Sequence, residues 1–200
     1  GSALLIDTLD STIEARKLPE SLVMVVCDTG KRRALVDGEY KARREQVESA
    51  AKKLGVSLLR HAPMGSWEHT ALTGNEAKRA KHVITENQRC LDFASALESG
   101  DRAALGRLMH ESHVSLRDDF EVSVAELDAM ALSCGEASGC VGARLTGAGF
   151  GGCCVALVKS AQLEAFLSET EKGYTARVPH CTPRLFACRP TAGAEVLGTP

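Results

Sequence analysis

A glycine-dense stretch decides the fold of this chain, because residues 142–153 read GARLTGAGFGGC. The flanking residues 142–146 and 152–158 have the apolar composition of buried strands. Gly147, Gly149 and Gly152 match the G-x-G-x-x-G spacing of dinucleotide-binding proteins, but that fingerprint requires a helix to begin at the loop. Strand-like sequence follows here instead. The stretch therefore predicts two strands joined by a glycine turn, and it argues against a dinucleotide-binding βαβ unit.

Glycine serves such a turn in one of two ways. It permits a positive φ in a tight connection, or it lets backbone N–H groups approach an anion closely. The glycine spacing leaves both open. Thr146 adds a hydroxyl at the entrance of the turn, which slightly favours phosphate. No Gly-Lys-Ser/Thr follows, so the turn is not a Walker A loop.

Two more strands and one helix extend this pair. Residues 22–27 (LVMVVC) form a continuous β-branched run, which predicts a strand buried on both faces. Residues 184–188 predict a last short strand. Before it, Ser160 is expected to cap a helix ending near Lys172, with an apolar face formed by Leu163, Phe166 and Leu167.

The region between residues 28 and 142 carries helical periodicity. A first helix is expected from an N-cap at Asp37 to a stop at Gly55, with Tyr40, Val47, Ala51 and Leu54 on one stripe. After a loop over 57–74, a long helix is predicted from Asn75 to Gly100. Its expected apolar stripe contains Ala77, Ala80, Ile84, Asn87, Leu91, Ala94 and Leu97.

Two shorter helices complete this region. Asp101 is expected to cap one of them, whose buried face comprises Leu105, Leu108, Met109 and Ser112. The other begins with Ser123-x-x-Glu126, the pattern of a capping box, and Val122 is placed to staple against Leu127.

The order of these elements is strand, several helices, strand, strand, helix, strand. This order predicts an α+β fold, a ferredoxin-like split βαβ sheet with extra helices inserted in the first crossover. Residues 1–18 are partly alternating and predict a hairpin or linker, and residues 19–200 form the main domain.

The composition is that of an ordinary globular chain. It has 200 residues, of which 44% are hydrophobic, and 24 basic against 26 acidic residues leave a net charge of −2. This balance offers no electrostatic footprint for nucleic acid or an anionic membrane. No apolar run approaches the ~20 residues that span a bilayer. We expect a cytoplasmic protein.

Candidate metal ligands are present but weakly patterned. None of the eight cysteines forms a Cys-x-x-Cys pair, so we expect them to pack as small apolar side chains. His110 and His113 have metal-binding spacing on a predicted helix but lack a third ligand. Asp118, Asp119 and Glu121 could bind Mg²⁺, although an exposed acidic connection between helices is the favoured interpretation.

The glycine stretch resembles the third signature of the GHMP small-molecule kinases, in the form found in galactokinases. The resemblance covers residues 3–197 and is far more specific than any single motif. The other matching segments, in the family's order, are 27–33 (CDTGKRR), 39–44 (EYKARR), 79–86 (RAKHVITE) and 111–123 (ESHVSLRDDFEVS).

The resemblance implies a GHMP kinase C-terminal domain and a reaction. Galactokinases use ATP and Mg²⁺ to phosphorylate the anomeric hydroxyl of galactose, in a cleft between two domains. The implied sugar contact is Tyr40, which from the sequence alone could equally be an apolar stripe residue. The residues implied to lie close to the phosphates are Thr146, Gly147, Ala148, Gly149, Gly151 and Gly152.

The family's other two signatures are not found in these residues. The Glu-His-x-Asp segment, the Gly-Leu-Ser-Ser-Ser phosphate loop and the base for the sugar hydroxyl are absent, so no catalytic residue and no metal ligand is assigned. We expect the C-terminal half of a galactokinase, inactive without its N-terminal domain and able to dimerise through the exposed interdomain surface. The alternatives are an N-acetylgalactosamine kinase, or a non-catalytic module that senses galactose and ATP or binds a partner.

Overall fold

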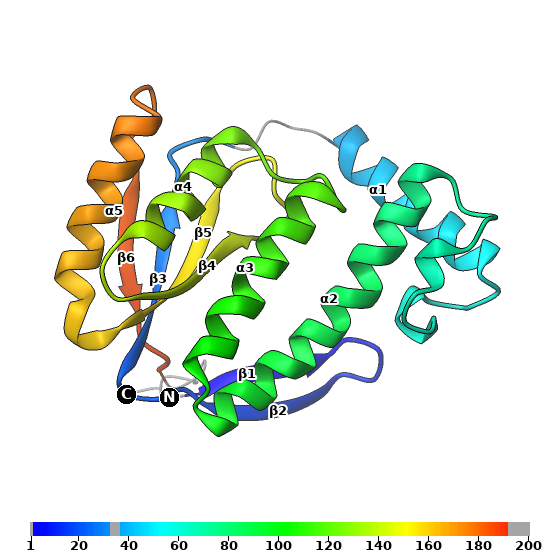
Figure 1. Ribbon diagram of the computed structural model, residues 1–200, viewed down its shortest axis with the longest axis horizontal. Coiled ribbons are helices and arrows are strands. Elements are labelled where there is room, and N and C mark those ends of the chain that lie inside the picture. Colours follow the sequence, from blue (N-terminus) through cyan, green and yellow to red (C-terminus); the bar gives the residue numbers. More distant parts are fainter. Residues whose placement is uncertain (1, 33–36, 192–200) are drawn as a thin grey trace, which may run out of the picture.

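The computed structural model describes residues 2–32 and 37–191, and its centre is a four-stranded sheet (Figure 1). All neighbouring strands are antiparallel, in the order β4-β5-β3-β6. This is the order of a split βαβ sheet of ferredoxin type, so the predicted fold class is confirmed. The strands are β3 (Leu22–Asp28), β4 (Cys140–Thr146), β5 (Cys153–Lys159) and β6 (Arg184–Cys188).

Helices fill both crossovers of the sheet. The second crossover contains α5 (Leu163–Arg177), which packs beside α4 (Figure 1). The first crossover contains four helices where a simple split βαβ unit has one, and the three that precede α4 are the predicted insertion. These four are α1 (Asp37–Lys53), α2 (Gly74–Ser99), α3 (Arg102–Asp118) and α4 (Ala125–Glu136).

The main core lies between α4, α5 and one face of the sheet. Alternate residues of β3, Val23, Val25 and Cys27, point to this side and are buried, as the two-residue period of a strand requires. Met130 of α4 and Phe166 of α5 cover them and are fully buried. Burial of each large apolar side chain contributes roughly 1.5–3 kcal/mol, so this layer supplies much of the folding free energy.

The opposite face of the sheet is only half covered. Leu22 and Leu157 pack against α2 and α3. Farther along the face, Met24 is 38% exposed and Phe186 is 51% exposed. The prediction that 22–27 is buried on both faces is therefore wrong at Met24, because the inserted helices reach only part of this side.

A pair of glycines brings α3 onto the edge strand β4. A Cβ built on Gly106 would lie 2.2 Å from the carbonyl oxygen of Val141, and one on Gly142 would lie 2.9 Å from the Cα of Gly106. Real Cβ atoms do not approach so closely. The absence of both side chains thus allows helix and strand backbones to touch.

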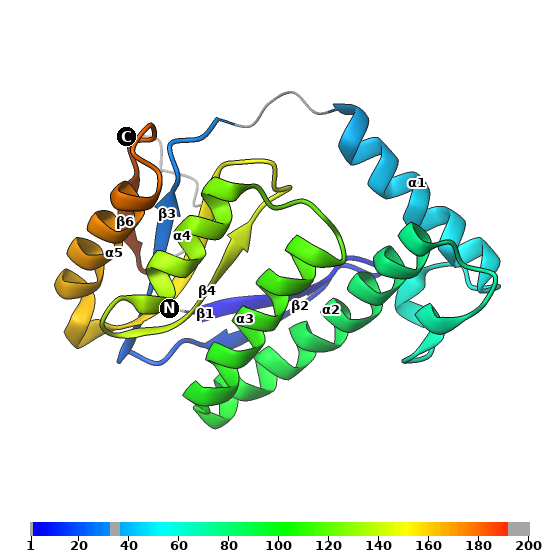
Figure 2. The ribbon, with the colours of Figure 1, turned by 45° about the horizontal axis from the view of Figure 1, so that its top comes forward.

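The inserted helices α1 and α2 form a lobe beside the sheet (Figure 2). Gly55, with a φ of +70°, ends α1 as predicted. The expected N-cap, Asp37, is instead the first residue of the helix. The chain between the two helices contains the short helices η1 (Leu59–His61) and η2 (Ser66–Glu68), within the predicted 57–74 loop.

The long helix α2 begins with a capping box of Thr73 and Glu76 and ends at Gly100. Its predicted apolar stripe is partly wrong, because Asn87 and Leu91 are exposed. The helix packs against α1 in its first half and against α3 in its second, so its buried face changes direction along its length. The next helix, α3, agrees with its prediction, since Asp101 accepts from the Ala104 N–H.

Two predicted helix caps are wrong. The N-cap of α4 is Val124, and the Ser123 hydroxyl donates to Asp128 instead of capping. Ser160 begins a short helix, η3 (Ser160–Gln162), and its hydroxyl donates to the Glu20 carbonyl. In the first case a carboxylate of the same helix takes the hydroxyl that the pattern assigned to a cap, and in the second a distant carbonyl does.

Residues 2–17 form the antiparallel hairpin β1 (Ser2–Asp7) and β2 (Thr12–Lys17), which lies along α2 (Figure 2). Arg16 pairs with Glu98 of α2, and Asp7 pairs with Arg60. The other face of the hairpin is apolar and exposed. Among the described residues, no helix has both the length and the apolar character needed to cross a bilayer.

Candidate functional site

The glycine turn joins β4 directly to β5, which begins at Cys153. A strand and not a helix follows Gly152, so the dinucleotide-binding interpretation is excluded. Positive φ angles occur through the turn, at Gly147 (+79°), Gly149 (+79°), Phe150 (+59°), Gly151 (+123°) and Gly152 (+88°). This backbone is open to glycine and strained for other residues, which explains the density of glycine.

Two backbone segments clamp the turn from either side. On one side, the Phe150 N–H donates to the Val122 carbonyl at 2.8 Å. A Cβ on Gly149 would lie 2.1 Å from that same oxygen. On the other side, the Gly152 N–H donates to the Lys31 carbonyl at 3.0 Å, and the Gly152 carbonyl accepts from the N–H of Thr29 at 3.0 Å. The turn is therefore held in one conformation before any ligand binds.

Three residues of the turn have N–H groups that are not used within the described fold, and of these Gly147 is exposed, Ala148 half-buried and Gly151 buried. Within the described residues, the backbone N–H groups of Gly147, Ala148 and Gly151 have no protein acceptor. Thr146 lies half-buried at the end of β4, at the mouth of the turn. Successive N–H groups in left-handed backbone form a concave site for anions. The geometry thus supports both roles of glycine: it permits positive φ in a tight turn, and it allows backbone N–H groups to approach an anion.

Basic groups surround this turn. Lys31 and Arg32 follow β3, and Lys31 contacts the turn through its own carbonyl. Arg184 at the start of β6 pairs with Asp28 at 2.8 Å. Burial acts to raise the pKa of Asp28, but hydrogen bonds from this guanidinium and from the Gly30 N–H outweigh it and lower that pKa. The basic groups near the turn thus have carboxylate partners within the fold: Arg184 pairs with Asp28 and Lys31 pairs with Glu126.

Tyr40 lies near the start of α1 and is 57% exposed. Val47 and Leu54, which share its predicted stripe, pack in the cluster between α1 and α2, so Tyr40 does not belong to the core. No hydrogen bond or ion pair in the described part of the chain joins Tyr40 to the glycine turn. The structure leaves its ring free to meet a ligand.

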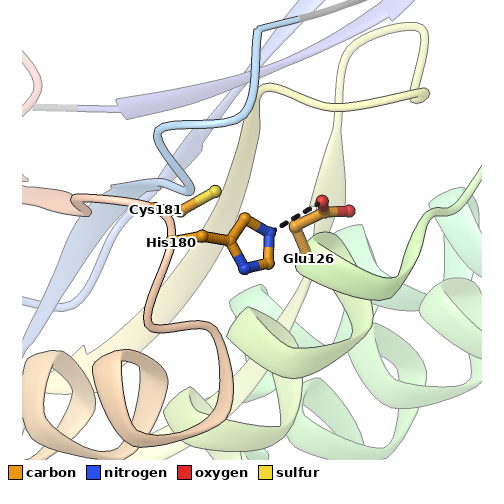
Figure 3. A group of neighbouring side chains, drawn as sticks. All are labelled: Glu126, His180 and Cys181. Atoms are coloured by element: carbon orange, nitrogen blue, oxygen red, sulfur yellow. Dashed lines mark ion pairs between the residues drawn. The ribbon is translucent and has the colours of Figure 1, made fainter.

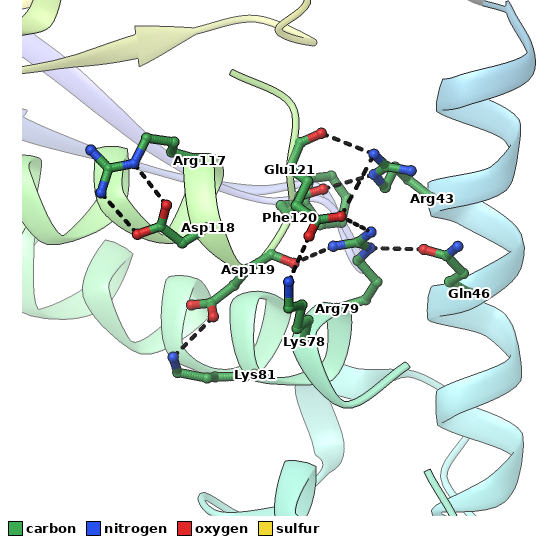
Figure 4. A network of polar contacts seen from close by, with 10 residues as sticks. All are labelled: Arg43, Gln46, Lys78, Arg79, Lys81, Arg117, Asp118, Asp119, Phe120 and Glu121. Carbon is green, nitrogen blue, oxygen red and sulfur yellow. Dashed lines mark hydrogen bonds and ion pairs between the residues drawn. The ribbon is translucent and has the colours of Figure 1, made fainter. Parts of the chain in front are cut away.

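A polar network connects α1 and α2 to the segment that seats the turn (Figure 4). Arg43 donates to the carbonyls of Phe120 and Glu121 at 2.8 and 3.0 Å. Arg79, whose side chain is 1% exposed, donates to the Asp119 carbonyl and pairs with Glu121 at 2.7 Å. These contacts fix the backbone that leads to Val122. The two arginines therefore position the glycine turn indirectly.

The acidic residues at the end of α3 and after it are engaged in ion pairs. Asp118 pairs with Arg117, Asp119 pairs with Lys81, and Glu121 pairs with Lys78 and Arg79 (Figure 4). Hydrogen bonds from Lys78 and Arg79 lower the pKa of Glu121 to about 2. The carboxylates neutralise basic side chains, which agrees with the favoured interpretation of an acidic helix connection.

His110 and His113, which have metal-binding spacing in the sequence, lie in different environments. His110 is exposed, whereas His113 is buried beneath β4. The Nδ1 atom of His113 accepts from the Leu145 N–H at 3.2 Å, and its Nε2 lies 3.3 Å from Asp128. Both ring nitrogens are used inside the fold, so His113 is structural.

The cysteines are free thiols in the structure. Cys27, Cys134 and Cys154 are fully buried in the main core, as expected for small apolar residues. Cys181 has a different environment, because its thiol lies close to the side chains of its neighbour His180 and of Glu126 in α4. No local spacing in the sequence could reveal that cluster.

Comparison with known proteins agrees with this geometry. Residues 93–174 match the family described as GHMP kinases C terminal. The galactokinase of Roseiflexus sp. (strain RS-1) is 40% identical in an alignment of 199 positions that covers 96% of this chain and 50% of that protein. The galactokinase of Streptococcus suis (strain 05ZYH33) is 38% identical over 98% of this chain and 52% of its own length. The chain thus spans about half the length of the curated relatives it matches.

Solved structures support the same relationship. Lactococcus lactis galactokinase complexed with galactose superposes with a TM-score of 0.85 at 31% identity, over 93% of this chain and 50% of that chain. Mevalonate kinase of L. major reaches 0.55 at 23% identity, over 96% of this chain and 50% of that chain, and so shares the fold alone. Residues 93–174 thus match the C-terminal domain of the GHMP kinases, and nearly the whole chain is similar to about half the length of galactokinases.

Proposed function

We propose that this chain supplies the C-terminal half of a galactokinase, which transfers the γ-phosphoryl group of ATP to the anomeric hydroxyl of galactose. The observation that carries the proposal is the difference in sequence identity between the galactokinases and a mevalonate kinase of the same fold. Similarity to galactokinases extends over nearly the whole chain at about 40% identity, whereas the mevalonate kinase shares the fold at 23%. The alternatives, an N-acetylgalactosamine kinase or a sensing module, have no comparable support.

In this proposal the glycine turn faces the phosphates of ATP. The available N–H groups of Gly147, Ala148 and Gly151 would donate to phosphate oxygens, and the Thr146 hydroxyl would add a further donor. Gly149 and Gly152 keep the turn seated between Val122 and the 29–31 segment. Phosphoryl transfer depends mainly on positioning and charge stabilisation, and a rigid set of N–H dipoles supplies both.

Tyr40 is proposed to contact the sugar. Its exposure supports this role, because an aromatic ring that is 57% exposed contributes little to the core. The Arg43 contacts to residues 120 and 121 connect its helix with the segment that seats the turn. The helix that carries Tyr40 is thus tied to the segment that seats the turn.

We do not assign ligands for the magnesium ion that accompanies ATP to the acidic groups of this chain. Mg²⁺ prefers octahedral oxygen ligands with several waters. The carboxylates nearest the turn, Asp28 and Glu126, are paired with Arg184 and Lys31. In the proposal the metal ligands and the base for the sugar hydroxyl lie in the N-terminal half, and a cytoplasmic location stays a prediction from the sequence.

The test measures galactose phosphorylation by the chain alone and after mixing with a separately produced N-terminal half of a related galactokinase. We expect no turnover alone and measurable turnover in the mixture. Ordinary kinase turnover by the chain alone, or a preference for N-acetylgalactosamine, would contradict the proposal. A failure of the halves to associate is detected separately by ultracentrifugation, and a fused two-half chain then replaces the mixture.

A matched pair of variants tests the turn itself. Gly152 and Gly55 both have positive φ, and a Cβ on either meets open space. Alanine at each position costs about 1 kcal/mol of backbone strain. We expect Gly152→Ala to raise the KM for ATP of the reconstituted enzyme at least tenfold and Gly55→Ala to leave it unchanged. An equal effect of both variants would mean that the turn does not contact ATP.

A further inference from the structure

Three potential metal ligands converge next to the glycine turn, on residues that the kinase comparison does not use. Glu126 lies in the first turn of α4, and His180 and Cys181 lie in the segment between α5 and β6 (Figure 3). One ligand atom from each residue lies within 4.8 Å of the other two. The Glu126 Oε1 atom is 3.6 Å from the Nε2 atom of His180.

The backbones that carry these side chains are held in place by the surrounding fold. The Cys181 N–H donates to the Val178 carbonyl at 3.2 Å. The buried Tyr174 hydroxyl donates to the Thr29 carbonyl at 2.8 Å, which ties α5 to the end of β3. A Cβ on Gly30 would lie 2.4 Å from the Thr182 carbonyl oxygen, so the two loops are in close contact. Ligand binding thus requires side-chain movement and little backbone ordering.

The Glu126 carboxylate already has a cation as its partner in this cluster. Lys31 Nζ lies 3.1 Å from its Oε1 atom. The Lys31 side chain is 45% exposed and that of His180 is 69% exposed. Both can therefore rotate when a metal ion enters.

The donor set selects the kind of metal. One thiolate, one imidazole and one carboxylate are the ligands that Zn²⁺ takes in proteins, whereas Mg²⁺ and Ca²⁺ need mainly oxygen. Tetrahedral bonds of about 2.0–2.3 Å place ligand atoms roughly 3.3–3.8 Å apart. The observed separations are within a small side-chain adjustment of that range.

We propose that Glu126, His180 and Cys181 bind one Zn²⁺ ion, with a fourth position open to water. On binding, the Cys181 thiol releases its proton to solvent and coordinates as the thiolate. The ion replaces the Lys31 ammonium as the partner of Glu126. It links the first turn of α4 to the α5–β6 segment, beside the carbonyl of Lys31 that accepts from the Gly152 N–H.

The experiment titrates the full chain with Co²⁺ and then displaces it with Zn²⁺. A thiolate–cobalt bond gives a charge-transfer absorption that reports Cys181 directly, apart from any kinase activity. We expect one equivalent of metal per chain. Cys181→Ser should abolish the band, and His180→Gln and Glu126→Gln should each weaken the affinity at least tenfold.

Matched controls come from the same chain. Cys90 is an exposed cysteine and His110 an exposed histidine, both remote in sequence from the cluster. Cys90→Ser and His110→Gln should leave the titration unchanged. Lys31→Met removes the competing ammonium and should tighten metal binding. Circular dichroism on each variant shows that it is folded.

Two results would overturn the proposal. One is a wild-type chain that shows no thiolate–cobalt band at millimolar Co²⁺. The other is a band that survives Cys181→Ser and is lost in Cys90→Ser. Thermal unfolding gives an independent measurement, because a ligand that binds only the folded state raises Tm. Zn²⁺ should raise the Tm of the wild-type chain and leave that of the Cys181→Ser variant unchanged.

Discussion

Gly149 illustrates how one residue determines the shape of the candidate phosphate site. A side chain is excluded there for two separate reasons: the φ of +79°, and the 2.1 Å that would separate an added Cβ from the Val122 oxygen. Gly152 in the same turn has only the first of these reasons, since its Cβ would meet open space. The glycines of the turn are thus not equivalent, although the sequence presents them as one run.

We predict that Gly149→Ala destabilises the chain by about 2–4 kcal/mol, the sum of left-handed strain and steric overlap. Gly152→Ala serves as the control and should cost about 1 kcal/mol from strain alone. Urea unfolding of both variants measures the difference. Equal losses would show that the contact with Val122 is not rigid.

His82 gives a prediction about pH. It is buried against Phe120, with ring centroids 4.5 Å apart, and its Nδ1 lies 3.0 Å from the Ser115 hydroxyl. Burial lowers its pKa from 6.5 to about 4. Between pH 6.5 and pH 4 the unfolded chain therefore binds a proton at His82 that the folded chain does not bind. The contribution of His82 to the free energy of unfolding is complete above pH 6.5 and is lost as the pH falls towards 4.

The expected loss is roughly 3 kcal/mol between pH 7 and pH 4, at about 1.4 kcal/mol per unit of pKa difference. Urea unfolding at pH 7, 6, 5 and 4.5 measures the free energy of unfolding. In the His82→Gln variant, the free energy of unfolding should fall less steeply with decreasing pH, because this histidine no longer titrates. Some pH dependence should remain, because carboxylates such as Glu121 titrate in both proteins. Parallel slopes would contradict the assignment.

Among the elements, α1 is held by an apolar cluster with α2 in its second half and by polar contacts of Arg43 nearer its start. Arg43 donates to two carbonyls of the 119–122 segment, and its side chain is only 12% exposed. The adjacent Arg44 is 74% exposed and pairs with Glu48 on its own helix. Two neighbouring arginines therefore have different roles.

We predict that Arg43→Gln lowers stability by about 1.5–3 kcal/mol, because two charged hydrogen bonds to carbonyls are lost. Arg44→Gln should change it by less than about 0.5 kcal/mol, as surface ion pairs do. Hydrogen exchange resolves the site of the effect. Protection should fall in α1 and residues 119–123 of the Arg43 variant, and a uniform loss over all elements would argue against this local connection.

Elements with a local signal could be predicted, and those that depend on distant partners could not. The run 22–27, the β4-turn-β5 unit and the Asp101 cap were predictable, because period and capping chemistry lie within a few residues. The cap at Ser123 failed although its partner is local, because Asp128 of the following helix competes for its hydroxyl. Other contacts join elements that are far apart in the sequence, so the spacing of residues could not predict them. Examples are the contacts of Arg79 and the cluster of Glu126, His180 and Cys181.

At the scale of the whole molecule, the chain leaves two apolar surfaces uncovered. The outer face of the hairpin shows Leu4, Ile6 and Ile13, which are 52–62% exposed and lie on one side of the ribbon. Met24 and Phe186 lie on the half-covered face of the sheet. Contiguous exposed apolar side chains are typical of surfaces that meet another protein, and the chain spans about half of its relatives' length.

We predict that the isolated chain self-associates at high concentration and binds an apolar dye, and that Ile13→Lys reduces both. Ile13 and Ile6 are direct cross-strand partners, so a charge at Ile13 interrupts the centre of the patch. Leu132 is an apolar residue on α4, 53% exposed and outside the hairpin, and Leu132→Lys is the matched control. Sedimentation velocity and dye fluorescence should change for Ile13→Lys alone. Equal changes in both variants would mean that association follows general hydrophobicity, and the hairpin would then not be the surface that a partner domain covers.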